Sequence, residues 1–303
     1  MLDRLAGNTA LKKDLTSALA CGRLAHSILL VGEPGCGAGF AARCLAADYL
    51  YPNGGPHAEG VVNQADPECI TLRGEGASGQ IPVAKIRDAR DAIQRSAMST
   101  DAAGRVLFIY DAQNLNGSSA NAMLKILEEP PEGVLFLLTA SSSATVLPTI
   151  RSRCALYMVA PVERGVCAAA LRQAQPGLVP KNADTLAFLY EGHIGSCLDI
   201  LRDPASRALL QTAGGLCACA EKGDTYQALA LLTGFEKDRA QASALLRQAR
   251  FIASGALRQP GFGGISAPRA ARLIEAADEA ERVRKANGNL KLLLTVFGAR
   301  ICA

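Results

Sequence analysis

The chain has 303 residues, of which 49% are hydrophobic and 20% charged, and its formal net charge is +4. This composition excludes a disordered or fibrous protein, allows two or three domains with cores of their own, and is too weakly charged to indicate nucleic-acid binding by itself. Neither a membrane span nor a signal peptide is evident, so we expect a cytoplasmic protein.

The first predicted core element is a buried strand over Ser27–Val31, which runs into a glycine-rich segment at 32–39. An alanine-rich pattern over 40–50 follows and predicts a helix. Strand, glycine loop and helix in this order form the setting in which backbone N–H groups cradle phosphates.

The glycine loop lacks the side chains that ATP hydrolysis needs. Gly32, Gly35 and Gly37 supply glycines, but Ala38 stands where a lysine would reach the β- and γ-phosphates, and Gly39 where a hydroxyl would hold Mg²⁺. Hydrogen bonds to charged groups contribute about 1.5–3 kcal/mol each, so their loss weakens ATP binding by orders of magnitude. We therefore expect no functional ATP site and no cofactor, leaving open weak phosphate binding by the loop amides.

Two more apolar strands are predicted further along the chain, over 105–111 and 133–139. Near-continuous apolar strands separated by helical segments indicate an α/β fold with a parallel sheet covered on both faces. Functional groups then collect at the carboxyl ends of the strands. The intervening segment 51–79 is rich in Gly, Pro, Asn and Asp, and we expect it to be irregular.

After Pro161 the patterns are helical. We divide the chain into a core at 1–161, a small helical domain at 162–203 and a larger helical domain at 204–303. The last helix carries an apolar stripe, which fits either packing inside its own domain or a subunit contact: Leu290, Leu293, Leu294, Phe297 and Ile301.

Basic residues are more frequent in the C-terminal half. The first 160 residues carry 14 Lys and Arg against 15 Asp and Glu, and the remainder carry 18 against 13. This excess fits a polyanionic partner, but composition favours an ordinary solvated helical surface.

Four stretches, at 22–32, 121–131, 147–154 and 287–294, resemble the clamp-loader branch of the AAA+ family, most closely its delta-prime members. The Glu-Glu-Pro-Pro turn and the Ser-Arg-Cys triplet within them are the most specific. The resemblance covers nearly the whole chain. It implies a RecA-like parallel-sheet core, a small helical lid and an all-helical collar that joins five subunits into a ring.

The resemblance assigns roles that this chain does not fill. In active members, the acid that ends the second strand holds Mg²⁺ and a neighbouring glutamate polarises water. Here Asp111 is followed by Ala112, so a local structural role for Asp111 is favoured. With Ala38, Gly39 and Ala112 changed together, we expect no intrinsic ATPase activity.

Two basic residues keep candidate roles. The arginine of the family's Ser-Arg-Cys triplet acts in trans as an arginine finger on the ATP of the neighbouring subunit, which implies that role for Arg153 over a surface salt bridge. Arg151 fits a structural pair better than an assisting role. Lys125 lies where clamp loaders face DNA, but a solvated lysine is the more economical interpretation.

No metal is expected. Delta-prime members often carry a four-cysteine zinc module after the loop helix, whereas between Leu50 and Ile70 this chain offers only His57 and Cys69. The ten cysteines are scattered without a C-x-x-C pair, which favours buried packing. The region 53–64 then needs another source of order.

These observations favour a non-catalytic subunit of the bacterial DNA polymerase III clamp loader and thus a component of the holoenzyme. Its expected partners are the gamma/tau and delta subunits, the sliding clamp and primer–template DNA. The alternatives are an active motor-type ATPase of the same assembly, and a scaffold that uses the AAA+ fold for other partners.

Overall fold

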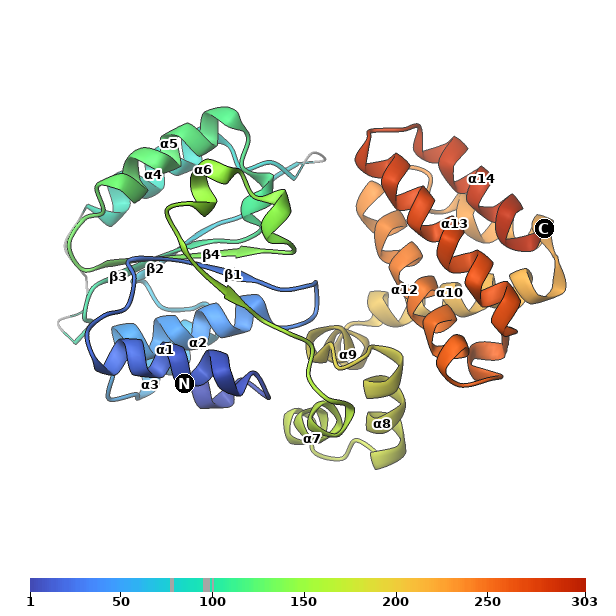
Figure 1. Ribbon diagram of the computed structural model, residues 1–303, viewed down its shortest axis with the longest axis horizontal. Coiled ribbons are helices and arrows are strands. Elements are labelled where there is room, and N and C mark those ends of the chain that lie inside the picture. Colours follow the sequence, from blue (N-terminus) through green and yellow to red (C-terminus); the bar gives the residue numbers. More distant parts are fainter. Residues whose placement is uncertain (77–78, 95–98, 100) are drawn as a thin grey trace. The chain divides into compact units, whose positions relative to one another are not determined.

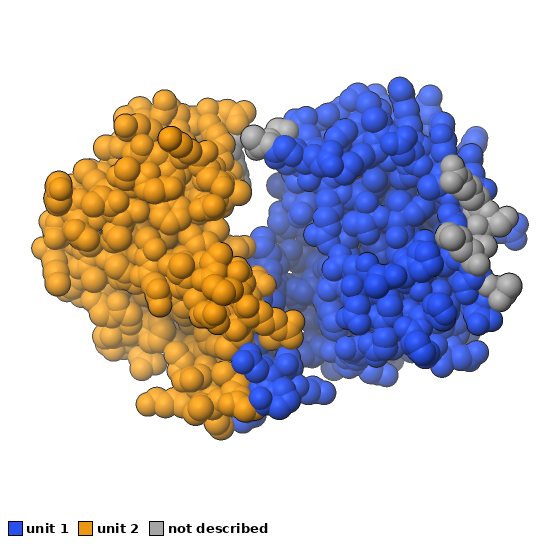
Figure 2. Space-filling model, turned by 180° about the vertical axis from the view of Figure 1, so that it is seen from behind, with its two compact units in different colours: residues 1–176, 192–195 blue, residues 177–191, 196–303 orange. Residues whose placement is uncertain are grey.

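The computed structural model describes residues 1–76, 79–94, 99 and 101–303. The chain forms two compact units, coloured separately in Figure 2: unit 1 comprises 1–176 with 192–195, and unit 2 comprises 177–191 with 196–303. The three-part division at residues 161 and 203 remains a prediction. No helix within the described residues is long and apolar enough to cross a membrane.

Unit 1 contains a five-stranded parallel sheet in the order β2-β3-β4-β1-β5 (Figure 1). The sheet confirms the predicted α/β class, and its three central strands coincide with the predicted apolar runs. The strands are β1 (Ser27–Val31), β2 (Cys69–Leu72), β3 (Arg105–Ile109), β4 (Val134–Ala140) and β5 (Ala155–Met158).

Helices cover both faces of the sheet, as Figure 1 shows. Every residue of β1 is buried, and its alternate side chains enter two different cores: Ile28 and Leu30 face α2, whereas Leu29 and Val31 face the α4 and α5 side. One face carries α1 (Thr9–Ala20), α2 (Ala38–Leu50) and α3 (Pro56–Val62), and the other carries α4 (Val83–Ile93) and α5 (Gly117–Glu128). Short elements complete the unit: η1 (Leu2–Arg4), η2 (Ala112–Asn114), η3 (Ser143–Thr145), α6 (Pro148–Arg151) and α7 (Arg164–Ala174).

The expectation of an irregular segment at 51–79 is wrong. Within its described part, α3 packs on α2, and β2 pairs in parallel with β3 as an edge strand of the sheet. Seven residues of helix and four of strand are too short to show a clear hydrophobic period, and the surrounding glycines and prolines hide both.

A polar network around the buried Asp66 carboxylate orders this segment. The Tyr51 hydroxyl donates to its two oxygens at 3.1 and 3.3 Å, and the backbone N–H of Glu68 donates at 3.0 Å. The His57 ring stacks on Tyr51, with centroids 5.4 Å apart, and places Nδ1 3.5 Å from the same carboxylate. This network therefore orders the region 53–64, for which the sequence analysis had identified no ordering contacts.

A buried ion pair joins the beginnings of β2 and β3. Arg105 Nε lies 3.2 Å from Glu68 Oε2, and the side chain of Glu68 is fully buried. Glu68 Oε1 also accepts from the backbone N–H of Ser99 at 2.7 Å, and Arg105 Nη1 donates to the carbonyl of Ala92 at 2.6 Å. These bonds attach the first residue of β3 to the end of α4, and Ser99, before β3, to the residue that precedes β2.

Within the described residues, unit 2 contains helices and their connecting turns and no strand, in agreement with the helical pattern after Pro161. Asp203, Asp224, Asp238 and Asn289 each accept hydrogen bonds from backbone N–H groups at a helix start, so ordinary N-caps fix these boundaries. The helices are α8 (Pro180–Leu189), α9 (Ile194–Arg202), whose first residues belong to unit 1, α10 (Pro204–Lys222), α11 (Thr225–Thr233), α12 (Arg239–Arg258), η4 (Phe262–Gly264), α13 (Ala267–Lys285) and α14 (Leu290–Cys302).

The apolar stripe of α14 is buried inside unit 2. All five of its predicted members are buried, and α14 packs on α11 and α13. Packing within the unit therefore accounts for this stripe, leaving Leu292 and Val296 as the exposed large apolar side chains of the helix.

The buried ion pair yields a stability prediction. Glu68→Leu leaves the Arg105 charge buried without its counter-ion, so we expect a loss of about 3–5 kcal/mol in unfolding free energy. The double variant Glu68→Leu/Arg105→Met removes both charges and should recover most of that loss. Urea unfolding followed by circular dichroism measures both; a double variant no more stable than the single one would contradict the prediction.

Candidate functional site

The glycine loop connects β1 to α2 at the carboxyl edge of the sheet. The backbone N–H of Gly32 continues the ladder to Ala140 O at 3.0 Å, and α2 begins at Ala38. Gly35 and Gly37 both have φ of 96°, which a residue with a Cβ rarely adopts, so these two glycines are needed for the turn itself. The loop therefore keeps its backbone shape.

A distant segment of unit 1, residues 192–195, is fastened to this loop. The backbone N–H of Gly195 donates to Gly35 O at 2.8 Å, and the buried His193 ring places Nε2 3.2 Å from Glu33 Oε2. The sequence offered no local sign of this contact, because about 160 residues separate its members. It ties the outer part of the loop to the residues that begin α9.

The space beside Gly39 is filled by an aromatic ring. A Cβ placed on Gly39 would lie 3.1 Å from Cε1 of Tyr110, closer than most such contacts. The Arg73 guanidinium covers the Tyr110 ring at 4.0 Å from its centroid, and Arg43 Nη1 lies 3.5 Å from its hydroxyl. Tyr110 thus occupies the position next to which a magnesium-binding hydroxyl would have to be built. Sequence reasoning missed it, although it directly precedes Asp111.

Asp111 and Ala112 follow β3 at the same edge. The backbone N–H of Asp111 donates to Thr139 Oγ1 at 3.2 Å, and its exposed carboxylate accepts from the Gln113 amide at 3.2 Å. Ala112 is buried and begins a turn of 3₁₀ helix, so it presents no polar group. Residues 32–39 and 110–112 therefore meet at one edge, with the backbone of a nucleotide site and without its reactive side chains.

The Ser-Arg-Cys triplet follows α6 and precedes β5. The Ser152 hydroxyl donates to Thr149 O at 3.1 Å, and Cys154 packs against the core, where burial raises its thiol pKa to about 12. Arg153 stands between these two anchors. Its Nη1 donates to Thr149 O at 3.0 Å, and its Nη2 lies 2.6 Å from Glu128 Oε1 at the end of α5.

Arg153 and the glycine loop lie at opposite ends of the parallel strands. The loop follows the carboxyl end of β1, whereas Arg153 precedes the amino end of β5, and the two strands are parallel neighbours. The Arg153 guanidinium therefore lies beside the end of α5, and the length of the strands separates it from the glycine loop of its own chain.

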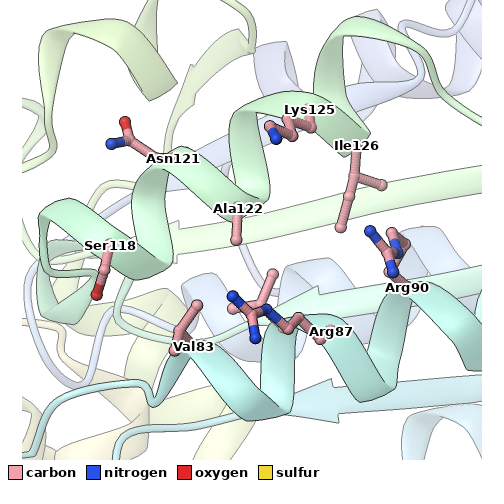
Figure 3. Close-up of a pocket in the computed structure, with 9 residues that line it drawn as sticks. Val83, Arg87, Arg90, Ser118, Asn121, Ala122, Lys125 and Ile126 are labelled. Carbon is pink, nitrogen blue, oxygen red and sulfur yellow. The ribbon is translucent and has the colours of Figure 1, made fainter.

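Lys125 lines a shallow basic groove between α4 and α5 (Figure 3). Arg87 and Arg90 extend from α4 toward α5, and Arg90 pairs with Asp91 at 3.1 Å. The groove has a volume of about 290 Å³ and an apolar floor that includes Ile86. Three basic side chains from two helices thus line one groove. Of these three, only Lys125 was singled out in the sequence analysis.

His57 and Cys69, the two metal ligands considered from the sequence, belong to the network around Asp66 and to β2 respectively. Across the described part of the chain, no group of three or more His, Cys, Asp or Glu residues is placed to hold a metal ion.

A family model and several known proteins match this chain. Residues 7–163 match the family model described as DNA polymerase III, delta subunit. The delta-prime subunit of DNA polymerase III from Escherichia coli K12 is 28% identical over 229 residues, covering 72% of this chain and 67% of that protein. The gamma/tau subunit from Mycobacterium tuberculosis H37Rv is 33% identical over 160 residues, covering 49% of this chain but only 27% of that longer protein.

Solved structures show the same fold. A gamma subunit-related protein of DNA polymerase III from Thermotoga maritima matches with a TM-score of 0.53 and 19% identity, over 95% of this chain and 99% of that one. A Thermotoga maritima RuvB variant matches with a TM-score of 0.51 and 14% identity, over 99% and 88%. The fold is therefore the expected AAA+ arrangement of a RecA-like core followed by helices.

The packing of Tyr110 against Gly39 yields a stability prediction. Gly39→Thr places new atoms against a fixed ring, so we expect a loss of about 1–3 kcal/mol in unfolding free energy, as for other overpacked sites. Gly165→Thr is the matched control, because Gly165 is also the second residue of its helix and has open space around it. Chemical denaturation of both variants measures the difference; equal stabilities would show that Tyr110 does not close the site.

Proposed function

The chain belongs to the DNA polymerase III delta-subunit family, a group of clamp-loader-related AAA+ proteins, and from this membership we propose that it is a non-catalytic subunit of a bacterial clamp loader. In this role it presents Arg153 to ATP bound by a neighbouring subunit. The neighbour hydrolyses that ATP as the assembly loads a sliding clamp onto primed DNA.

Three features of the carboxyl edge support a non-catalytic role. Ala38 and Ala112 provide no charge to phosphate, metal or water, and Tyr110 fills the space next to Gly39. Phosphoryl transfer depends on positioned charges that stabilise the transition state. A site without its lysine, its magnesium hydroxyl and its glutamate lacks all three sources.

The observation that carries the trans role is the position of Arg153 at the opposite edge of the sheet from its own loop. An arginine in this position can contact a nucleotide only if another subunit binds that nucleotide. Its guanidinium is permanently charged and exposed, and Ser152 and Cys154 fix the backbone on either side. Such an arginine can contact a γ-phosphate as negative charge develops during hydrolysis.

The proposed partners follow from the relatives, which are named as gamma/tau and delta-prime subunits of DNA polymerase III. We place this chain in one complex with gamma/tau and delta subunits, with residues 204–303 as the helical collar. Within that complex, Arg87, Arg90 and Lys125 would contact the phosphate backbone of primer–template DNA. Phosphate contacts suit a loader that must act at any sequence.

The arginine-finger role predicts the effect of Arg153→Ala in the reconstituted complex. Arginine fingers contribute about 10³–10⁵ in kcat, so we expect hydrolysis at the neighbouring site to be almost abolished while assembly is normal. Arg151→Ala is the control, because that exposed guanidinium donates to Ser143 O instead and its loss should change little. Steady-state ATP hydrolysis with clamp and primed DNA measures both.

Three outcomes would contradict this proposal. Unchanged hydrolysis in the Arg153→Ala complex would remove the trans role. ATP turnover by the isolated chain would instead support the active motor-type ATPase. Failure to assemble with gamma/tau and delta subunits would favour a scaffold with other partners.

The basic groove predicts a phosphate contact by Lys125. In the assembled complex, Lys125→Ala should weaken DNA binding about equally for all sequences and reduce the salt slope of log K by about 1. Lys13→Ala is the control, because Lys13 is an exposed lysine on α1, across the sheet from the groove. Fluorescence anisotropy with labelled primed DNA over a salt series measures the slopes; identical slopes for both variants would exclude the contact.

A further inference from the structure

The Arg153 guanidinium already holds an anion of its own chain. Nη2 lies 2.6 Å from Glu128 Oε1, while Nη1 donates to Thr149 O at 3.0 Å and lies 3.4 Å from Ser152 Oγ. A carboxylate therefore occupies one side of the group that would contact phosphate. Glu128 belongs to the Glu-Glu-Pro-Pro turn, to which no role in the chemistry has been assigned.

We propose that Glu128 is a positioning residue for Arg153: it holds the guanidinium in a resting pose and is displaced when Arg153 engages the ATP of the neighbouring subunit. This inference rests on the proposed function, because it requires Arg153 to act in trans. In addition to that function, the Glu128 carboxylate competes with the γ-phosphate of the neighbour's ATP for the Arg153 guanidinium, and the γ-phosphate replaces Glu128 during engagement.

Electrostatics requires an exchange of partners. A carboxylate paired with Arg153 would approach the γ-phosphate together with it, and the two like charges repel at such distances. Arginine donates five N–H groups in one plane, and a phosphate that takes the outer ones competes with the carboxylate at Nη2. Glu128 must therefore move aside for full engagement.

The pair is suited to release because it is exposed. The side chains of Arg153 and Glu128 are 36% and 49% exposed, and ion pairs in such surroundings are weak. The bond from Arg153 Nη1 to Thr149 O is separate from Glu128 and keeps the side chain near its place after release. Glu128 thus lowers the fraction of free Arg153 without locking it.

The position of Glu128 is fixed by its own helix. It is the last residue of α5, and the buried Ile126 and Leu127 anchor the final turn. Glu129 then leaves the helical conformation, with φ of −125° and ψ of 71°, and the following proline disfavours a further helical residue, so the helix ends there. An acid at a helix C-terminus is unfavourable next to the helix dipole, and Arg153 offsets that charge.

The test compares variants in the complex reconstituted with gamma/tau and delta subunits. Glu128→Gln removes the charge with little change in shape, and Glu129→Gln is the matched control on the adjacent exposed carboxylate. Because exposed pairs are weak, we expect Glu128→Gln to raise ATP hydrolysis without clamp and DNA about two- to fivefold. The rate with clamp and DNA should remain near that of the wild type, since Arg153 is then already engaged.

A double-mutant cycle decides whether the effect acts through Arg153. In the Arg153→Ala background, Glu128→Gln should change nothing, because the group it restrains is gone. Persistence of the increase in that background would overturn the proposal, as would a Glu128→Gln rate equal to that of Glu129→Gln or below the wild type. Size-exclusion chromatography and thermal unfolding establish that each variant folds and assembles.

The two proposals fail in different ways. If Arg153→Ala leaves stimulated hydrolysis unchanged, the trans role is wrong and the role of Glu128 is wrong with it. If Arg153→Ala abolishes that hydrolysis and Glu128→Gln behaves as its control, the trans role stands and only the restraint by Glu128 is overturned.

Discussion

The parallel pairing of β1 with β5 is the constraint on which the functional geometry depends. It places the glycine loop and Arg153 at opposite edges of one sheet, because one follows a strand and the other precedes its parallel neighbour. The five buried residues of β1 hold both cores together, so neither edge can shift without disturbing the packing. In the proposed complex, this arrangement offers different groups to the neighbours on the two sides of the subunit.

Parts of the fold and of the site could be predicted because short continuous stretches of the sequence determine them. The strands β1, β3 and β4 are continuous apolar runs, the missing side chains of the loop are visible from spacing alone, and Arg153 belongs to a short specific triplet. The edge strands β2 and β5 were missed because each has four residues and is only partly buried. A half-exposed strand of that length carries too little hydrophobic pattern to be recognised.

The contacts around the site were not predictable, because they join residues from different elements that only the completed fold brings together. Glu128 with Arg153, Tyr110 with Gly39, and His193 with Glu33 each depend on how the completed fold brings two segments together. The network around Asp66 is a further case: Tyr51, His57 and Asp66 are individually unremarkable in sequence, yet together they order the segment expected to be irregular.

The contact between Tyr110 and Gly39 also bears on how such a subunit evolves. A hydroxyl side chain at position 39 meets the ring, and a smaller residue at 110 leaves a cavity beneath Arg73, so we expect either change alone to lower stability. Recovery of a magnesium ligand thus requires two substitutions at once, before any lysine or glutamate is restored. Under the proposed function, this packing means that no single substitution returns ATP hydrolysis to this subunit.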